Sequence, residues 1–262
     1  MLMYKRIIVK IGTGVISRSD GSLATEVLEQ LVDQTAQLRK KGTEVIVVTS
    51  GAVGTGRGLI DLPIADSVVA SQVFAAVGQV KLMSTYAKYF AERGFVCAQV
   101  LATKEDFRDK EHYQNMKNCM SNLLQDNVVP VVNENDVVAV AELVFTDNDE
   151  LAGLIAEQLD VDAVIILTSV EGFFAGNPKD TSAKIIQEIN ISDADLYEKY
   201  ITDGRSTSGK GGMLTKFSVA KKLGKLGIAT HIVNGHRPNV LLDVVSGKKI
   251  GTKFLPGKNR AA

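Results

Sequence analysis

The chain has 262 residues, of which 45% are hydrophobic and 23% are charged, and its 30 Lys and Arg residues balance its 30 Asp and Glu residues. This length is enough for one large α/β domain with a sizeable core, or for two small domains. The neutral balance gives no electrostatic reason to expect a nucleic acid or a membrane surface as a partner, and two cysteines form neither a disulfide framework nor a metal cluster.

The N-terminal stretch MLMYKRIIVKIG is too short and too charged for a signal peptide, and the sequence has no run of about 18 apolar residues. We therefore expect a cytoplasmic protein with no nucleic-acid and no membrane partner. The same stretch contains the first predicted strand, 6–12. A helix is predicted over 24–40, with apolar residues on one face and Gly42 placed to end it. The next strand, 44–50, contains continuous apolar residues, which are typical of a parallel strand buried on both faces.

The rest of the chain alternates short apolar runs with longer helical patterns. The runs predict strands over 95–101, 128–133, 163–169 and 230–235. Helical periodicity separates them over 71–93, 104–125, 147–159 and 213–226. This order predicts a three-layer α/β/α fold with a mostly parallel central sheet and helices on both faces. No linker divides the chain, so we expect one domain over 1–262.

Small and basic residues follow the first predicted strand, at the end of a sheet where ligands bind in open α/β folds. Lys10 stands beside Gly12 and Gly14, and small residues let backbone N–H groups approach a phosphate while a lysine adds positive charge. A strand that ends in a turn with a solvated Lys10 is the alternative. A dinucleotide-binding fingerprint is excluded, because its third glycine would stand at position 17, which is Ser17.

The turn after the second strand, SGAVGTGRG, places Ser50 and Gly51 between a buried strand and a helix. The first turn of a helix has unpaired N–H groups, so this geometry suits an anion or a substrate carboxylate. An ordinary strand-to-helix turn, with glycine for tight packing, explains the same residues.

Polar residues also follow the strand at 128–133, in the stretch NEND from Asn133 to Asp136. Four polar residues between apolar runs cost free energy unless they are solvated or bonded. Further on, Asp147 is placed to cap a helix, with Glu150 completing a capping box. The cap does not explain Asn148 and Asp149, which suit a substrate amine or the orientation of catalytic lysines.

The stretch TDGRSTSGKGGMLTK, 202–216, resembles a phosphate-binding P-loop but departs from it. Gly204, Gly209 and Lys210 fit G-x-x-x-x-G-K, yet Gly211 stands where a Ser or Thr should hold Mg²⁺. A flexible polar loop is one interpretation. The other is a nucleotide site of another kind, in which bare amides at a helix start and two lysines, Lys210 and Lys216, hold phosphates.

The three histidines, His112, His231 and His236, give no Ser/His/Asp order, and no His/Cys spacing fits a metal site. We expect them on the surface or at strand ends rather than in catalysis.

These residues together resemble the amino-acid kinase family nearly from end to end, and within it the members that phosphorylate glutamate. The likeness rests on seven stretches: 10–14, 47–56, 75–79 (AAVGQ), 106–115, 129–138, 146–152 and 209–216. The combination of PVVNEND, DNDELA and GGMLTK is specific, because sister kinases share the lysines and glycines but usually lack NEND. The resemblance implies a carbamate kinase-like fold, with a glutamate-binding lobe over about 1–160 and an ATP-binding lobe over about 161–258.

The resemblance also implies roles for residues of this chain. Catalytic roles would belong to the charged residues Lys10, Lys216 and Asp149. Glutamate would be bound by Ser50, Gly51, Asn135, Asp136 and Asn148. ATP would be bound by Lys10, Gly12, Thr168, Ser169, Lys210, Gly211, Gly212, Met213, Leu214, Thr215 and Lys216. Ser169 stands where the family usually has Asp, which weakens one nucleotide contact.

The activity that the resemblance implies is ATP-dependent phosphorylation of the glutamate side-chain carboxylate, with Mg²⁺ carried by ATP and no metal held by protein side chains. It further implies a homo-oligomer (dimer or tetramer), feedback inhibition by proline and a downstream glutamyl phosphate reductase. Many relatives carry a C-terminal PUA domain, for which 262 residues leave no room, so we expect the kinase domain alone. The alternatives are a sister kinase for another carboxylate or carbamate, and a non-catalytic small-molecule sensor on the same fold.

Overall fold

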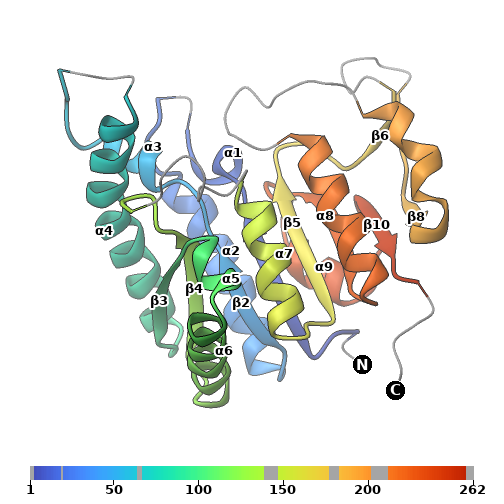
Figure 1. Ribbon diagram of the computed structural model, residues 1–262, viewed down its shortest axis with the longest axis horizontal. Helices are drawn as coiled ribbons and strands as arrows, with labels where there is room; N and C mark the ends of the chain where they lie inside the picture. The colour runs from blue at the N-terminus through green and yellow to red at the C-terminus, as the bar shows by residue number, and fades with distance from the viewer. Residues whose placement is uncertain are drawn as a thin grey trace.

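An eight-stranded sheet forms the centre of the computed structural model, which describes residues 3–18, 20–63, 67–138, 147–176, 183–201 and 212–257 (Figure 1). The strand order is β3-β4-β2-β1-β5-β9-β10-β8, and every neighbouring pair is parallel except β9 and β10. The strands are β1 (Arg6–Ile11), β2 (Glu44–Val48), β3 (Cys97–Ala102), β4 (Val129–Glu134), β5 (Ala163–Thr168), β8 (Glu188–Asn190), β9 (Ala229–Asn234) and β10 (Thr252–Leu255). Two short strands, β6 (Phe174–Ala175) and β7 (Lys184–Ile185), pair separately.

Helices cover both faces of the sheet. They are α1 (Thr13–Ile16), α2 (Thr25–Lys40), α3 (Ala52–Arg57), α4 (Val68–Glu92), α5 (Glu105–Arg108), α6 (Lys110–Gln125), α7 (Asn148–Gln158), α8 (Met213–Lys225) and α9 (Val240–Val245), with a 3₁₀ helix, η1, over Ile191–Tyr200. One core cluster joins α2, α4 and α9 to the sheet, and a second joins α6, α7 and α8 to its other face (Figure 1). The predicted three-layer α/β/α fold with a mostly parallel sheet is therefore confirmed.

The alternation of side chains along β1 decides which face receives Lys10. Ile7, Val9 and Ile11 pack in the cluster with α2 and α4, while Ile8 packs in the cluster with α6 and α7. Because successive side chains of a strand point to opposite faces, Lys10 shares the face of Ile8. Lys10 therefore points toward the layer that contains α7 and α8.

The structure moves some predicted boundaries. The predicted helix over 104–125 is divided, because Asp109 adopts an extended conformation and its side chain caps α6 by accepting from the His112 backbone N–H. Strand β4 ends one residue beyond the predicted strand, at Glu134, and both Asn133 and Glu134 are buried. The short strands β6, β7, β8 and β10 were not predicted, because two to four residues carry too little periodicity.

Helices α3 and α4 touch backbone to backbone. A Cβ added at Gly56 would lie 1.9 Å from the Phe74 carbonyl oxygen, and one added at Gly78 would lie 1.9 Å from that of Ala52. Any larger side chain at either position would separate the helices. The two glycines thus fix α4 against the helix that follows β2.

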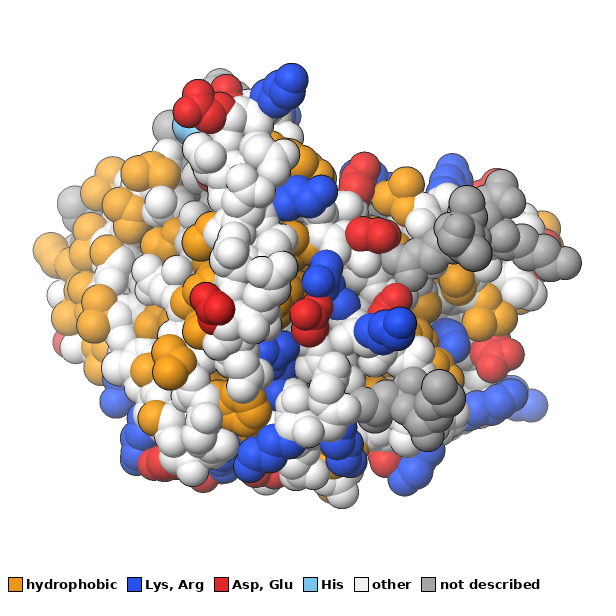
Figure 2. Space-filling view, turned by 90° about the horizontal axis from the view of Figure 1, so that it is seen from below, with side chains coloured by type: hydrophobic (Ala, Val, Ile, Leu, Met, Phe, Trp, Pro, Cys, Tyr) orange, Lys and Arg blue, Asp and Glu red, His pale blue; other side chains and the backbone are white. Residues whose placement is uncertain are grey.

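The outer face of α4 is apolar. Val68, Val69, Val73 and Val80 are exposed on it. Figure 2 shows hydrophobic side chains gathered on the left of the molecule, the side on which Figure 1 places α4 and β3. Among the described residues, none of the helices combines the length and the apolar character that a membrane crossing requires.

His231 corrects the expectation that the histidines lie on the surface or at strand ends. It is the third residue of β9, only 5% exposed, and its Nε2 lies 2.8 Å from the hydroxyl of Tyr4. Burial, and next the nearby charge of Lys253, lower the pKa of His231 to about 3. His231 is therefore neutral in the folded protein at any pH at which the protein is expected to work.

This burial predicts a loss of stability in mild acid. In the unfolded chain His231 takes up a proton near its ordinary pKa of about 6.5, whereas the folded state binds none until about pH 3. The stability is thus intact above about pH 6.5 and falls as the pH drops below it, by up to about 1.4 kcal/mol per pH unit from this group. Urea unfolding between pH 7 and pH 5 should show a shallower decline in His231→Gln than in wild type. His236→Gln, at an exposed position, is the control, and an unchanged slope in His231→Gln would contradict the assignment.

Candidate functional site

Three charged side chains meet at the carboxyl ends of the central strands. Lys10 comes from β1, Asp149 from the first turn of α7 and Lys216 from the first turn of α8. The Lys10 Nζ lies 2.7 Å from Asp149 Oδ1, and the Lys216 Nζ lies 2.9 Å from Asp149 Oδ2. Asp149 is fully buried, and the two lysines are 5% and 8% exposed. The structure thus brings together the three residues predicted to be catalytic, which we call the Lys-Asp-Lys centre.

The charges of this centre stabilise one another. Burial acts to raise the pKa of Asp149, but the charges and hydrogen bonds of Lys10 and Lys216 outweigh it and leave the pKa below its ordinary value. The carboxylate therefore stays ionised. Each ammonium has three N–H donors, and the bond to Asp149 occupies one of them. The remaining donors suit an anion with several oxygens, such as a phosphoryl group.

Asp147 caps the helix that carries Asp149. Its Oδ1 accepts from the backbone N–H groups of Asp149 at 2.8 Å and Glu150 at 3.2 Å, which confirms the predicted helix cap. Its Oδ2 is buried and has no hydrogen-bond partner within the described residues. Burial first, and then the charge of Asp149, raise the pKa of Asp147 to about 6. The cap fixes the first turn of α7, from which both Asn148 and Asp149 reach the site.

An amide group lies next to this centre. Asn148 Nδ2, which has two N–H groups, lies within hydrogen-bond distance of three acceptors: the Thr49 carbonyl oxygen at 2.7 Å, Ser50 Oγ at 3.0 Å and Asn133 Oδ1 at 2.9 Å. Two predicted glutamate-binding residues, Ser50 and Asn148, are therefore in direct contact. Asn148 Oδ1 is buried, and none of the described residues donates a hydrogen bond to it.

The other residues predicted to bind glutamate lie at the same edge of the sheet. Gly51 has a left-handed backbone with φ 96° and begins α3, a conformation that favours glycine. Asn135 and Asp136 directly follow β4 and are half-buried. The backbone N–H of Asn135 donates to the carbonyl oxygen of Ala102 at the end of β3.

The residues predicted to bind ATP gather at the ends of β1 and β5 and the start of α8. Gly12 passes so close to β5 that an added Cβ would lie 3.1 Å from the Leu167 carbonyl oxygen. Thr168 ends β5, and Ser169 follows it on the surface. Gly212 precedes α8 without a side-chain cap, and Met213, Leu214, Thr215 and Lys216 form its first turn. Lys210 and Gly211, with the rest of the stretch 202–211, fall outside the described residues.

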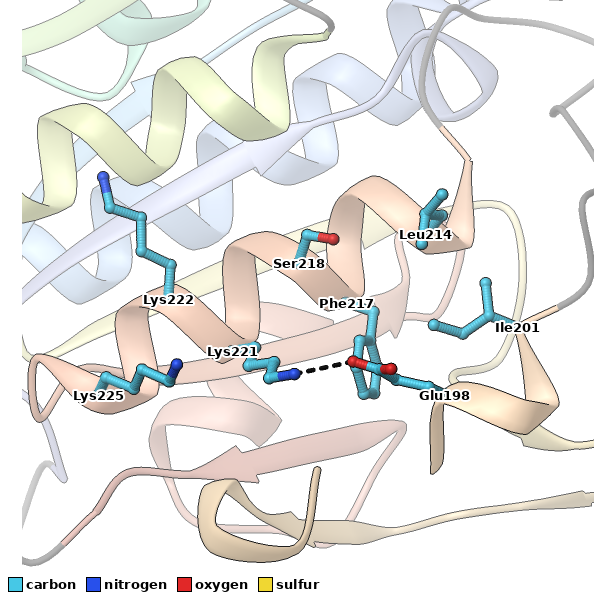
Figure 3. Close-up of a pocket in the computed structure, with 8 residues that line it drawn as sticks. All are labelled: Glu198, Ile201, Leu214, Phe217, Ser218, Lys221, Lys222 and Lys225. Carbon is cyan, nitrogen blue, oxygen red and sulfur yellow. Dashed lines mark hydrogen bonds and ion pairs between the residues drawn. The ribbon is translucent and has the colours of Figure 1, made fainter. Parts of the chain in front are cut away.

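A groove of about 530 Å³ lies between the outer face of α8 and η1 (Figure 3). It is lined by Glu198, Ile201, Leu214, Phe217, Ser218, Lys221, Lys222 and Lys225. Carboxylates hold two of its lysines: Asp195 and Glu198 bind Lys221, and Glu157 of α7 binds Lys222. The groove therefore presents less free positive charge than its lysines suggest, and Leu214 alone belongs to the predicted ATP residues.

Three residues at the site were not predicted as functional. Asn133 links Asn148 to Gln79 of α4, and the Thr49 carbonyl oxygen accepts from Asn148. The sequence held a signal for two of them, since Asn133 begins NEND and Gln79 ends AAVGQ. No local pattern marks Thr49, whose contribution is a backbone atom.

A comparison with known protein families identifies the family of this chain. Residues 5–234 match the model of the amino acid kinase family. The chain belongs to the amino acid kinase family. Glutamate 5-kinase of Chlorobaculum tepidum is 48% identical over 98% of this chain and 70% of its own length, and that of Bacteroides thetaiotaomicron is 45% identical over 97% and 71%.

Solved structures of other kinases agree with this membership at the level of the fold. Carbamate kinase from Giardia lamblia, solved bound to AMP-PNP, superposes with a TM-score of 0.70 at 19% identity, covering 97% of this chain and 99% of its own. The UMP kinase from Bacillus anthracis superposes with a TM-score of 0.66 at 15% identity, covering 96% of each chain. These two proteins thus share the fold of this chain with few identical residues.

The Lys-Asp-Lys centre predicts a large stability defect in Asp149→Asn. The neutral amide would leave two buried ammonium groups facing each other without a carboxylate, so the free energy of unfolding should fall by about 3–5 kcal/mol. Urea denaturation at pH 7 measures it. Asp195→Asn, which removes an exposed carboxylate paired with Lys221, is the matched control and should stay close to wild type. Equal stability of Asp149→Asn and wild type would contradict the buried ion pairs.

Proposed function

We propose that this chain transfers the γ-phosphoryl group of ATP to the side-chain carboxylate of L-glutamate, giving L-glutamyl 5-phosphate and ADP, the first step of proline biosynthesis. The observation that carries the proposal is the Lys-Asp-Lys centre beside the Asn148 amide, in a chain 48% identical to a glutamate 5-kinase. The centre offers donors to a phosphoryl group, and the amide offers polar contacts to an amino acid.

The chemistry of this acceptor removes the need for a general base. A glutamate side chain has an ordinary pKa of about 4.3 and is already ionised at neutral pH. The barrier comes instead from repulsion between the carboxylate and the triphosphate. Lys10 and Lys216 offset that repulsion from two sides, because Asp149 fixes both ammonium groups, and in-line positioning contributes the rest.

Glutamate is proposed to bind where β2, β4 and α7 end or begin. Ser50, Gly51, Asn135, Asp136 and Asn148 would form this site. The contact of Asn148 with Ser50 supports it, since one amide reaches a residue of each neighbouring segment. Hydroxyl, amide and carboxylate groups match the two charged ends of an amino acid.

ATP is proposed to bind beyond β5 and the start of α8. Its site would be formed by Lys10, Gly12, Thr168, Ser169, Lys210, Gly211, Gly212, Met213, Leu214, Thr215 and Lys216. The uncapped start of α8 supports this placement, because its N–H groups suit phosphate oxygens. Mg²⁺ would arrive with ATP: no group of three metal-binding side chains exists among the described residues, and Mg²⁺ commonly takes its ligands from substrate phosphates and water.

The wider organisation follows from the same proposal. The glutamate-binding lobe would span about 1–160 and the ATP-binding lobe about 161–258 of one domain. The exposed valines of α4 support a homo-oligomer, dimer or tetramer, because association would remove them from water. We also propose a cytoplasmic location, feedback inhibition by proline, and a reductase that consumes the unstable acyl phosphate.

The two rivals predict different chemistry. A sister kinase would phosphorylate another carboxylate or carbamate, and a sensor would bind without turnover. The buried Lys-Asp-Lys centre argues against a sensor, because a binding protein has little need to hold two lysines around one carboxylate. The glutamate 5-kinases among the relatives argue against another acceptor.

An acceptor panel tests the function directly. ADP release should be fast with L-glutamate and much slower with N-acetylglutamate, aspartate or carbamate, at saturating Mg²⁺ and ATP. A coupled ADP assay measures it for all four acids in parallel. Turnover with another acid but not with glutamate would favour a sister kinase, and ATP binding without ADP release on any acid would favour a sensor.

The proposed roles of the two lysines predict a loss of rate in Lys10→Met and Lys216→Met. Each variant removes one cation from the transferred group, so kcat should fall by about 100-fold or more. The fold should survive, because Asp149 keeps the other lysine as its partner. Lys222→Met, on the exposed side of α8, is the matched control and should keep wild-type kcat. Near-normal kcat in either variant would overturn the role of that lysine.

A further inference from the structure

The backbone fixes the direction of the Asn148 amide. The Thr49 carbonyl oxygen can only accept, so the atom that lies 2.7 Å from it must be the Asn148 nitrogen, Nδ2. The amide oxygen, Oδ1, therefore faces the other way. It is buried, and none of the described residues donates a hydrogen bond to it, so its capacity to accept a hydrogen bond is unused.

The backbone fixes the Asn133 amide in the same manner. The N–H of Glu134 can only donate, and it lies 2.9 Å from Asn133 Oδ1. That oxygen also accepts from Asn148 Nδ2 at 2.9 Å. The Asn133 nitrogen must then point away from the site, and it donates to Gln79 Oε1 at 3.0 Å.

Gln79 closes this series of amides from the far side. Its Oε1 accepts from Asn133, and its Nε2 donates at 3.3 Å to Oε1 of the exposed Gln99 on β3. Every amide thus donates in one direction along Asn148, Asn133 and Gln79. Because Asn133 is buried, an acceptor at position 79 is what satisfies its nitrogen.

The place of Gln79 on α4 makes that acceptor rigid. The preceding residue, Gly78, lies against the Ala52 carbonyl oxygen of α3 so closely that no side chain fits. Seven residues on, on the same face of α4, Tyr86 bonds Thr49 Oγ1 through its hydroxyl at 2.9 Å. Helix α4 therefore supports the site at both Thr49 and Asn133.

We propose that Gln79 is a positioning residue for the acceptor amino acid, acting through Asn133 on Asn148. By accepting from the buried Asn133 nitrogen, it adds to the backbone contacts that hold the Asn133 oxygen toward Asn148, and so strengthens the arrangement that leaves the Asn148 oxygen for the ammonium group of the substrate. This inference rests on the proposed function, which places the amino acid beside Asn148. Gln79 itself touches no substrate, so its effect is on binding of the acceptor and not on phosphoryl transfer.

The matched pair Gln79→Met and Gln79→Glu tests the inference. Methionine keeps the size but removes the acceptor, so the KM for glutamate should rise about three- to tenfold, as expected for one lost hydrogen bond. kcat and the KM for ATP should stay within about twofold of wild type, because the Lys-Asp-Lys centre is untouched. Gln79→Glu keeps an acceptor for Asn133, so its KM for glutamate should stay close to that of wild type. Gln99→Met removes only the outer link and should leave all constants unchanged.

The outcomes separate this inference from the proposed function. Equal KM values in Gln79→Met and wild type, or equal defects in Gln79→Met and Gln79→Glu, would overturn it. Should wild type use another acid instead of glutamate, the proposed function fails, and the same two variants assayed on that acid decide the role of Gln79. Hydrogen exchange of the asparagine side-chain amides by NMR needs no substrate: faster exchange at Asn133 and Asn148 in Gln79→Met supports the inference, and unchanged exchange contradicts it.

Discussion

A fully buried carboxylate is costly unless opposite charges meet it, and Asp149 meets two. Lys10 lies on β1 and Lys216 lies on α8, and these two elements are far apart in the chain. The ion pairs of Asp149 therefore connect the first strand to α8. The same interaction serves chemistry. It places two ammonium groups close together in a buried setting, where their attraction for a phosphoryl group is stronger than in water. Without the carboxylate, two lysines could not be held so close.

The sheet provides the frame for this interaction. Parallel pairing of β1 with β2 and β5 brings the carboxyl ends of three strands to one edge, and the alternation along β1 turns Lys10 toward α7 and α8. Asp147 then caps α7 so that Asn148 and Asp149 leave its first turn in two directions. Asp149 reaches the lysines, whereas Asn148 reaches Ser50 and Asn133. One helix start thus joins the proposed phosphate site to the proposed acceptor site.

The layer order and the presence of the long helices could be predicted from the sequence, because apolar periodicity over 10 or more residues reports the buried face. The cap at Asp147 was predictable from another local pattern, because Asp147 and Glu150 have the spacing of a capping box. The meeting of Asp149 with Lys216 was not, since it depends on α7 and α8 being neighbours, and no local pattern encodes a contact across 67 residues. Family resemblance supplied that pairing. It did not supply Gln79, whose link to Asn133 spans 54 residues and depends on how closely two glycines let α3 and α4 approach.

The central claim is that Lys10 and Lys216, held by Asp149, flank the phosphoryl group that is transferred. The most direct measurement is a crystal structure of the chain with L-glutamate and a non-hydrolysable ATP analogue. The account predicts that both ammonium groups contact oxygens of the γ-phosphate while they keep their bonds to Asp149, with the glutamate side chain in line beyond it. A γ-phosphate bound away from either lysine, or a lysine that leaves Asp149 in the complex, would contradict the account.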